Sequence, residues 1–228
     1  MDEGVVMRLA TRGTVVTLLA VTILAGAPRL RSASSELPTP PAATTGAPSE
    51  SNCASCHSGN SGNQLFEITV IPPATSYIPG NTYNIAVGID DPGMVRWGFE
   101  ATALKNSDDT MAGTFSNIID THVTTKASGG RTYVCHTTNG VTSPSDPPAA
   151  QDGTWWSTVP NGPAAWAFQW TAPAQGTGSV TIYASGVAAN GDGDSAGDNG
   201  YVAQLTLTEE PPTPVTTTTW GKIKSLYR

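Results

Sequence analysis

Basic residues are scarce in this chain of 228 residues, which has 11 Lys and Arg against 18 Asp and Glu and a formal net charge of −7. A surface that binds nucleic acid needs clustered Lys and Arg, so the charge argues against nucleic acid as a partner. No stretch has the periodicity of a convincing amphipathic helix. Gly, Pro, Ser and Thr are plentiful instead, a composition that favours short strands joined by many turns.

Long hydrophobic runs are also lacking, and the longest apolar stretch, Thr14–Ala27, is short for a membrane span. Arg8 and Arg12 precede it and small residues follow it, so residues 1–33 are predicted to be a secretory signal peptide. Two acidic residues near the start are unusual in a signal, which makes Met7 a candidate true start. The alternative is an uncleaved single-span anchor. Either interpretation places the protein outside the cytoplasm: periplasmic, secreted or at the cell surface.

Cysteine is the third scarcity, with only Cys53, Cys56 and Cys135 in the chain. Outside the cytoplasm, closely spaced thiols are oxidised, attached to a cofactor or bound to metal. Because the number is odd, simple pairwise disulfides cannot use all three.

Two of the cysteines form the motif Cys53-Ala54-Ser55-Cys56-His57. Thiols at this spacing can each add to a vinyl group of one haem, and the following histidine then supplies an axial nitrogen to the iron. The sequence therefore predicts haem c, with Cys53 and Cys56 as the thioethers and His57 as the proximal iron ligand. A thioredoxin-like site lacks its βαβ context here, and a disulfide across so short a loop is sterically awkward.

Zinc is the other cofactor that the residues allow. Cys53 and Cys56 could join Cys135 and His136 in a tetrahedral Cys₃His set. A haem site has no need of Cys135, so this residue separates the two interpretations.

Four side chains are candidates for a second axial ligand of the haem: His136, His122, Met94 and Met111. We favour His136 as the distal ligand, because it lies in a strand-like run where a rigid scaffold would hold it. Spacing alone does not identify this ligand.

Composition divides the chain into segments. Residues 34–50 and 209–219 are rich in Pro, Ser and Thr and are predicted to be linkers, the first of them disordered. The folded domain is expected at residues 51–208. Residues 220–228 form a short basic and partly apolar tail that could serve in sorting or anchoring, or could simply be a frayed end.

Strand-like runs recur through this domain between turn signals. Eight are predicted: Leu65–Ile71, Thr82–Asp90, Arg96–Lys105, Phe115–Asp120, Arg131–Thr137, Ala165–Trp170, Ser179–Ala184 and Tyr201–Thr208. Trp166, Phe168 and Trp170 alternate on one of them and are expected to fill a core between two sheets. The pattern predicts an all-β protein, an immunoglobulin-like β-sandwich with a short haem-binding segment at its N-terminal side.

Several stretches carry a family resemblance: GAPSESNCASCHSGN, YIPGNTYNIAV, RWGFEATAL, YVCHT and WAFQWTAPAQGTGSVTIYASGVAANGDGDSAGD. In this order they resemble the bacterial reeler-like domain, also described as the choice-of-anchor V domain, over about residues 46–208. The resemblance implies an exported, surface-associated reeler-type sandwich. It matches Cys53, Cys56 and His57 to the haem-attachment segment and His136 to a histidine in a Tyr-x-x-His-Thr element. Cys135 is not part of that pattern, and no established reaction comes with the family.

Motifs for catalysis are absent, with no Gly-x-Ser-x-Gly, His-Glu-x-x-His or phosphate-binding loop. The acidic, Gly-rich stretch Asn190–Asp198 lacks a complete calcium-loop register and is expected to be a solvated hairpin loop. A small peroxidase would need an acid-base group that the sequence does not reveal, so an enzyme is not favoured.

The sequence therefore predicts an exported, surface-associated module with one covalent haem, serving electron transfer or redox or ligand sensing. Its expected partner is a redox protein or a cell-surface component, with membrane contact only through a possible anchor. The alternative is a non-catalytic structural or adhesive module with a Cys/His zinc site.

Overall fold

The computed structural model describes residues 39–58, 66–94, 96–116, 122–137, 164–192, 194–212 and 224. The expected signal peptide (residues 1–33) lies outside these residues, as does the tail at 220–228 except for Lys224. Among the described residues, no helix is long and apolar enough to cross a membrane.

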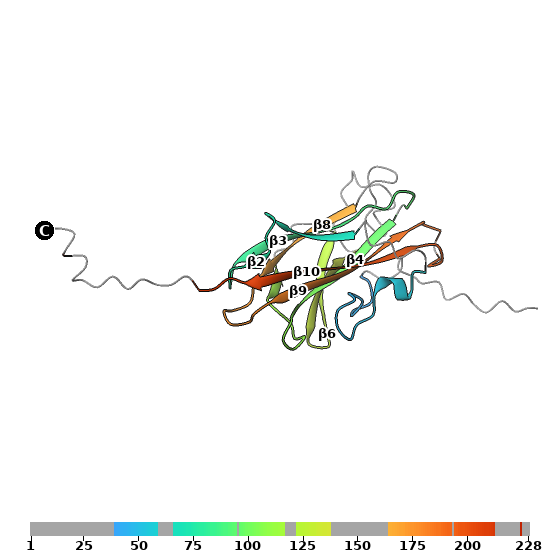
Figure 1. Ribbon diagram of the computed structural model, residues 1–228. Helices are drawn as coiled ribbons and strands as arrows, with labels where there is room; N and C mark the ends of the chain where they lie inside the picture. The colour runs from blue at the N-terminus through green and yellow to red at the C-terminus, as the bar shows by residue number, and fades with distance from the viewer. Residues whose placement is uncertain are drawn as a thin grey trace, which may run out of the picture. The chain divides into compact units, whose positions relative to one another are not determined.

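Nearly all regular structure is β, arranged in two sheets (Figure 1). The first sheet has four strands in the order β1-β3-β8-β5. They are β1 (Phe66–Ile71), β3 (Thr82–Ile89), β8 (Ala164–Thr171) and β5 (Thr114–Ser116), and every neighbouring pair is antiparallel.

The second sheet has six strands in the order β2-β10-β9-β4-β7-β6. They are β2 (Ser76–Tyr77), β10 (Asn199–Glu209), β9 (Val180–Ala189), β4 (Arg96–Lys105), β7 (Arg131–His136) and β6 (Val123–Ser128). All neighbours are antiparallel except β2, which runs parallel to β10.

The core lies between the sheets and is built from alternating strand residues. On β8, Trp166, Phe168 and Trp170 are at most 1% exposed, as predicted. From the second sheet, Phe99 on β4 stacks against them, with ring centroids 4.7 Å from Trp166 and 6.1 Å from Phe168. The expected β-sandwich is therefore confirmed.

All eight predicted strands have counterparts, although residues 117–120 of the fourth lie outside the described part. Strands β2 and β6 were not predicted from the sequence. Strand β6 forms a hairpin with β7 in which Ser128 pairs with Arg131 across Gly129 and Gly130. Both glycines have positive φ, 58° and 82°. This Gly-Gly turn between β-branched runs is a hairpin signal that could have identified β6.

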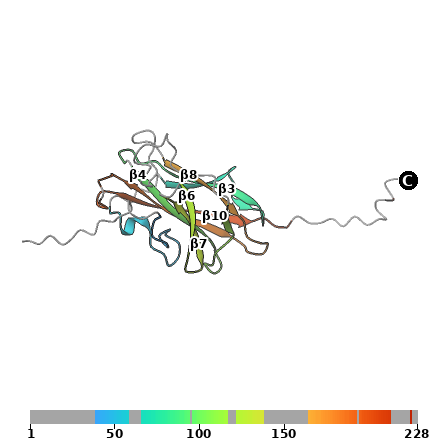
Figure 2. The same ribbon diagram turned by 180° about the vertical axis from the view of Figure 1, so that it is seen from behind.

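The six-stranded sheet has a second face, opposite the core, and residues 39–58 lie across it (Figures 1 and 2). The alternation of β4 places Phe99 in the core and Glu100 on this outer face. Thr44 donates to Glu100 Oε2 from its amide at 2.7 Å and from its hydroxyl at 2.9 Å. Residues 39–50, expected to be part of a disordered linker, therefore belong to the folded domain, because polar groups of the sheet bind them.

Candidate haem-binding segment on the outer face

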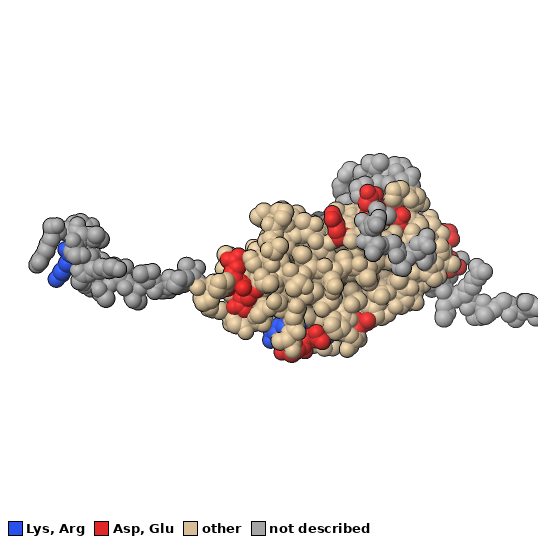
Figure 3. Space-filling view, viewed as in Figure 1, with Lys and Arg blue, Asp and Glu red and all other residues tan. Residues whose placement is uncertain are grey.

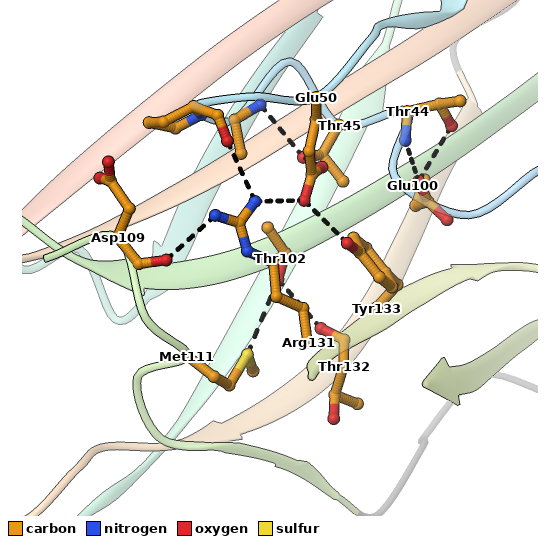
Figure 4. A network of polar contacts seen from close by, with 12 residues as sticks. Thr44, Thr45, Glu50, Glu100, Thr102, Asp109, Met111, Arg131, Thr132 and Tyr133 are labelled. Carbon is orange, nitrogen blue, oxygen red and sulfur yellow. Dashed lines mark hydrogen bonds and ion pairs between the residues drawn. The ribbon is translucent and has the colours of Figure 1, made fainter. Parts of the chain in front are cut away.

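A cluster of polar contacts holds this N-terminal segment against the sheet (Figure 4). Glu50 is its centre: Oε1 accepts from Arg131 Nη1 at 2.5 Å and from the Tyr133 hydroxyl at 2.8 Å, and Oε2 accepts from Thr45. Beside it, Lys126 Nζ lies 2.7 Å from Glu100 Oε1. Burial raises the pKa of Glu100, and the Lys126 ammonium partly opposes that shift.

The cysteine motif follows directly and begins with one short turn of 3-10 helix, η1 (Cys53–Ser55). The amides of Cys56 and His57 both donate to the Cys53 carbonyl, at 3.2 and 3.0 Å. The backbone from Cys53 to His57 therefore forms one compact turn.

Glycine in β10 lets this turn pack directly on the sheet. A Cβ at Gly200 would lie 2.5 Å from Ala54 Cα and 2.6 Å from Ala54 N, so only glycine leaves room for that backbone. The Cys53 amide donates to Ser185 Oγ on β9 at 2.9 Å. Ser185 in turn donates to the Tyr201 carbonyl at 2.7 Å. The motif is therefore fixed to two central strands at positions 132 or more residues downstream.

His57 is held by the hairpin loop between β9 and β10. Its Nδ1 lies 2.7 Å from Asp198 Oδ2, and the Asp198 side chain is only 2% exposed. Asp198 Oδ1 accepts from the Asn190 amide at 3.0 Å. Ser58 exchanges two backbone hydrogen bonds with the loop on either side of Ala196: it donates to the Ser195 carbonyl and accepts from the Gly197 amide. The stretch 190–198 is thus a hairpin loop as expected, but Asp198 is buried and bonded to His57 instead of solvated.

The three cysteines are all free thiols in this structure. Cys56 is exposed. Cys53 is partly buried, and that burial raises its pKa to about 11, although the contact with Ser185 opposes the shift. Cys135 is fully buried near Glu100 and Lys126, and burial raises its pKa to about 12. Both shifts favour the protonated thiol over the thiolate at neutral pH.

His136, the candidate distal ligand, ends β7 and is 6% exposed. Its Nδ1 lies 3.0 Å from the Phe99 amide nitrogen and 3.1 Å from the Phe99 carbonyl oxygen. A Cβ at Gly98 would lie 2.6 Å from its Cε1, so the ring occupies the space that a side chain there would fill. Burial lowers the pKa of His136 to about 4, and the nearby charges of Lys126 and His57 add to that shift.

The remaining candidate ligands have other surroundings. Met94 packs against the hydrophobic core, and Met111 Sδ accepts from the Thr102 hydroxyl at 3.7 Å beside Arg131 (Figure 4). The carbonyl of His122 accepts from the Thr137 amide at 2.8 Å. Within the described ranges, no three His, Cys, Asp or Glu residues are grouped closely enough to hold a metal ion. The Cys₃His zinc set therefore has no preformed geometry here.

Charge on the domain surface is mainly acidic on the face seen in Figure 3. Asp198, the functional candidate that the sequence analysis missed, does not add to it because it is buried. Its position one residue before β10 places it at the end of a hairpin loop, but only the fold shows that this end faces His57.

Comparisons with known proteins find similarity in structure alone. No protein-family model matches the chain, and no curated protein matches it in sequence. Among solved structures, the chain is similar to the Reelin-N domain of F-spondin, with 23% identity and a TM-score of 0.46, covering 69% of this chain and 95% of that one. It is also similar to the human F-spondin reeler domain, with 20% identity and a TM-score of 0.44, covering 66% and 92%. A type II cohesin domain from the cellulosome of Acetivibrio cellulolyticus matches with 11% identity and a TM-score of 0.35, covering 64% and 95%.

Proposed function

We propose that this domain is an exported, reeler-type surface module that carries one haem c on the outer face of its six-stranded sheet. Cys53 and Cys56 would form the thioethers, His57 would be the proximal ligand and His136 the distal ligand. The haem would supply a reversible one-electron couple, or a site for a small ligand if the distal bond opens. The role is electron transfer or redox or ligand sensing at the cell surface.

One observation carries this proposal: two free thiols and a histidine lie in one short turn that is fixed on the outer face of the sheet. The amides of Cys56 and His57 both donate to the Cys53 carbonyl, so the backbone of the motif forms one compact turn. The residues also fit the group chemically. Because Asp198 occupies Nδ1 of His57, Nε2 is the ring nitrogen left for iron.

His136 is suited to the opposite position for a separate reason. Its low pKa keeps the imidazole neutral at physiological pH, and only the neutral ring can donate a lone pair to iron.

The test is expression with export in a host that assembles c-type cytochromes. We expect the intact mass to increase by one haem, and the Soret band to survive denaturation and acid-acetone extraction because the bond is covalent. The double variant Cys53→Ala, Cys56→Ala should lose the band. Cys135→Ala is the matched control and should keep it. Absence of covalent haem from the wild-type protein would refute the proposal.

A second candidate is a structural or adhesive module in which the motif only ties the N-terminal segment to the sheet. The contacts of Cys53 with Ser185 and of His57 with Asp198 favour it, because they hold the segment without any cofactor. Under this alternative, Cys53→Ala would leave the segment on the sheet, since the Cys53 amide still donates to Ser185. Zinc content measured on the same preparation tests the metal version of this alternative.

A further inference from the structure

The loop between β9 and β10 places one buried carboxylate on the ring of His57. The distance from Nδ1 to Asp198 Oδ2 is 2.7 Å, and the two side chains are 12% and 2% exposed. An ionised carboxylate can only accept, so the proton in this contact belongs to Nδ1 of His57. Free histidine does not have this restriction, because either ring nitrogen can carry the proton when the ring is neutral.

The other oxygen of Asp198 is also in use. Oδ1 accepts from the Asn190 amide at 3.0 Å, across the mouth of the hairpin. The carboxylate is therefore held by the backbone at one oxygen and orients His57 with the other. Gly197 and Ser58 join the two segments by a backbone hydrogen bond of 3.2 Å, which keeps the loop and the motif in register.

We infer that Asp198 is a positioning residue that fixes His57 in the Nδ1–H tautomer and so makes Nε2 its metal-binding atom. The functional role of this tautomer rests on the proposed haem site, whereas the tautomer itself does not depend on haem. In the loaded protein, the buried carboxylate would also increase electron donation from the imidazole. That donation stabilises the ferric iron and lowers its reduction potential.

The variant Asp198→Asn separates this role from simple packing. An amide has one acceptor oxygen where the carboxylate has two, so it can satisfy either the Asn190 amide or the His57 Nδ1–H, but not both. If the backbone contact keeps the oxygen, the NH₂ group faces Nδ1 and forces the proton onto Nε2. Asp192→Asn is the matched control, since Asp192 is an exposed carboxylate of the same loop that bonds Asn190 Nδ2 and the Asp194 amide.

The first measurement uses the full chain exported from a host without haem assembly, labelled with ¹⁵N-histidine. The ring nitrogen shifts report the tautomer of His57 at a pH where the ring is neutral, and His57→Gln assigns the signal. We expect Nδ1–H in the wild type and in Asp192→Asn, and loss of that signature in Asp198→Asn. An Nε2–H ring in the wild type, or an unchanged ring in Asp198→Ala, which leaves no side-chain acceptor for Nδ1, overturns the inference.

The second measurement uses the haem-loaded chain. We expect Asp198→Asn to retain covalent haem by mass and to shift the reduction potential to more positive values, with Asp192→Asn unchanged. A potential equal to that of the wild type overturns the electronic part of the inference. If no haem attaches to the wild type, the proposed function fails, whereas the tautomer measurement still decides the role of Asp198.

Discussion

Because η1 packs directly on β10, the variant Gly200→Ala tests how the cysteine motif is held on the sheet. The new Cβ would lie 2.5 Å from Ala54 Cα, 2.6 Å from its Cβ and 2.6 Å from its amide nitrogen. Two of these atoms are backbone, so the clash cannot be relieved by a side-chain rotation. Either β10 shifts locally, or the turn lifts from the sheet.

Both routes cost a similar free energy. Overpacking of a close contact typically costs about 1–3 kcal/mol. If the turn lifts instead, the hydrogen bond from Cys53 to Ser185 is lost at about 1 kcal/mol, and the contact of His57 with Asp198 at about 1.5–3 kcal/mol. We therefore expect a loss of about 2 kcal/mol by the first route and somewhat more by the second. For a domain of this size, 2 kcal/mol lowers Tm by about 4–8 °C.

The assay is urea unfolding of the exported domain together with amide hydrogen exchange. Faster exchange confined to the Cys53 and His57 amides would identify the lifting route. Gly88→Ala on β3 is the matched control, because a Cβ there meets no atom closer than 3.9 Å. Equal unfolding free energies for Gly200→Ala and Gly88→Ala would refute the packing of η1 on β10.

Three further predictions concern burial, charge and the core. The pKa of His136 is lowered from 6.5 to about 4, so the folded protein binds a proton at this ring less readily than the unfolded chain does. The neutral ring therefore contributes about 3 kcal/mol to the free energy of unfolding above pH 6.5, and this contribution is lost as the pH falls toward 4. Urea unfolding at pH 7 and pH 4.5 should show this loss, and a His136→Gln variant should lack most of the slope. Glu50→Gln should weaken the contact with Arg131 and make residues 39–50 more sensitive to limited proteolysis, whereas an unchanged cleavage rate would contradict the role of Glu50 as the centre of that cluster. Trp166→Ala should cost about 3–5 kcal/mol in unfolding free energy because it empties a site that is 1% exposed, and a loss below 1 kcal/mol would contradict its place in the core.

Much of the fold could be predicted from local patterns. Alternation of large apolar residues identified β4 and β8, since every second side chain of a strand points to the same face and the face toward the core is apolar. The same rule fails for β6, Val123–Ser128, where Val123 is the one buried residue. Strand β2 has two residues and no periodicity at all, so its pairing with β10 is decided by tertiary contacts.

Composition misled the prediction for residues 39–50. Pro, Ser and Thr are abundant there, which is typical of disordered linkers. Their polar groups have partners in the fold, however, because β4 and β7 present Glu100, Arg131 and Tyr133 on the outer face. Glu100 is 0% exposed and would be an unfavourable buried charge without Thr44 and Lys126. A partner so distant in sequence leaves no local signal.

The candidate site also combines residues that the sequence reveals with one that only the fold brings to them. The thiols and His57 lie within five residues, so their association follows from spacing alone. Asp198 lies 141 residues from His57 and in a loop whose Gly and Asp content is typical of solvated turns. The hairpin of β9 and β10 nevertheless brings it to the ring, because η1 is seated on those two strands through Ser185 and Gly200. Removing the side chain of Asp198 would therefore leave η1 on the sheet and remove the contacts with His57 and the Asn190 amide, whereas adding one at Gly200 would disturb the packing of η1 on β10. The two positions thus separate what holds the motif on the sheet from what orients the ring of His57.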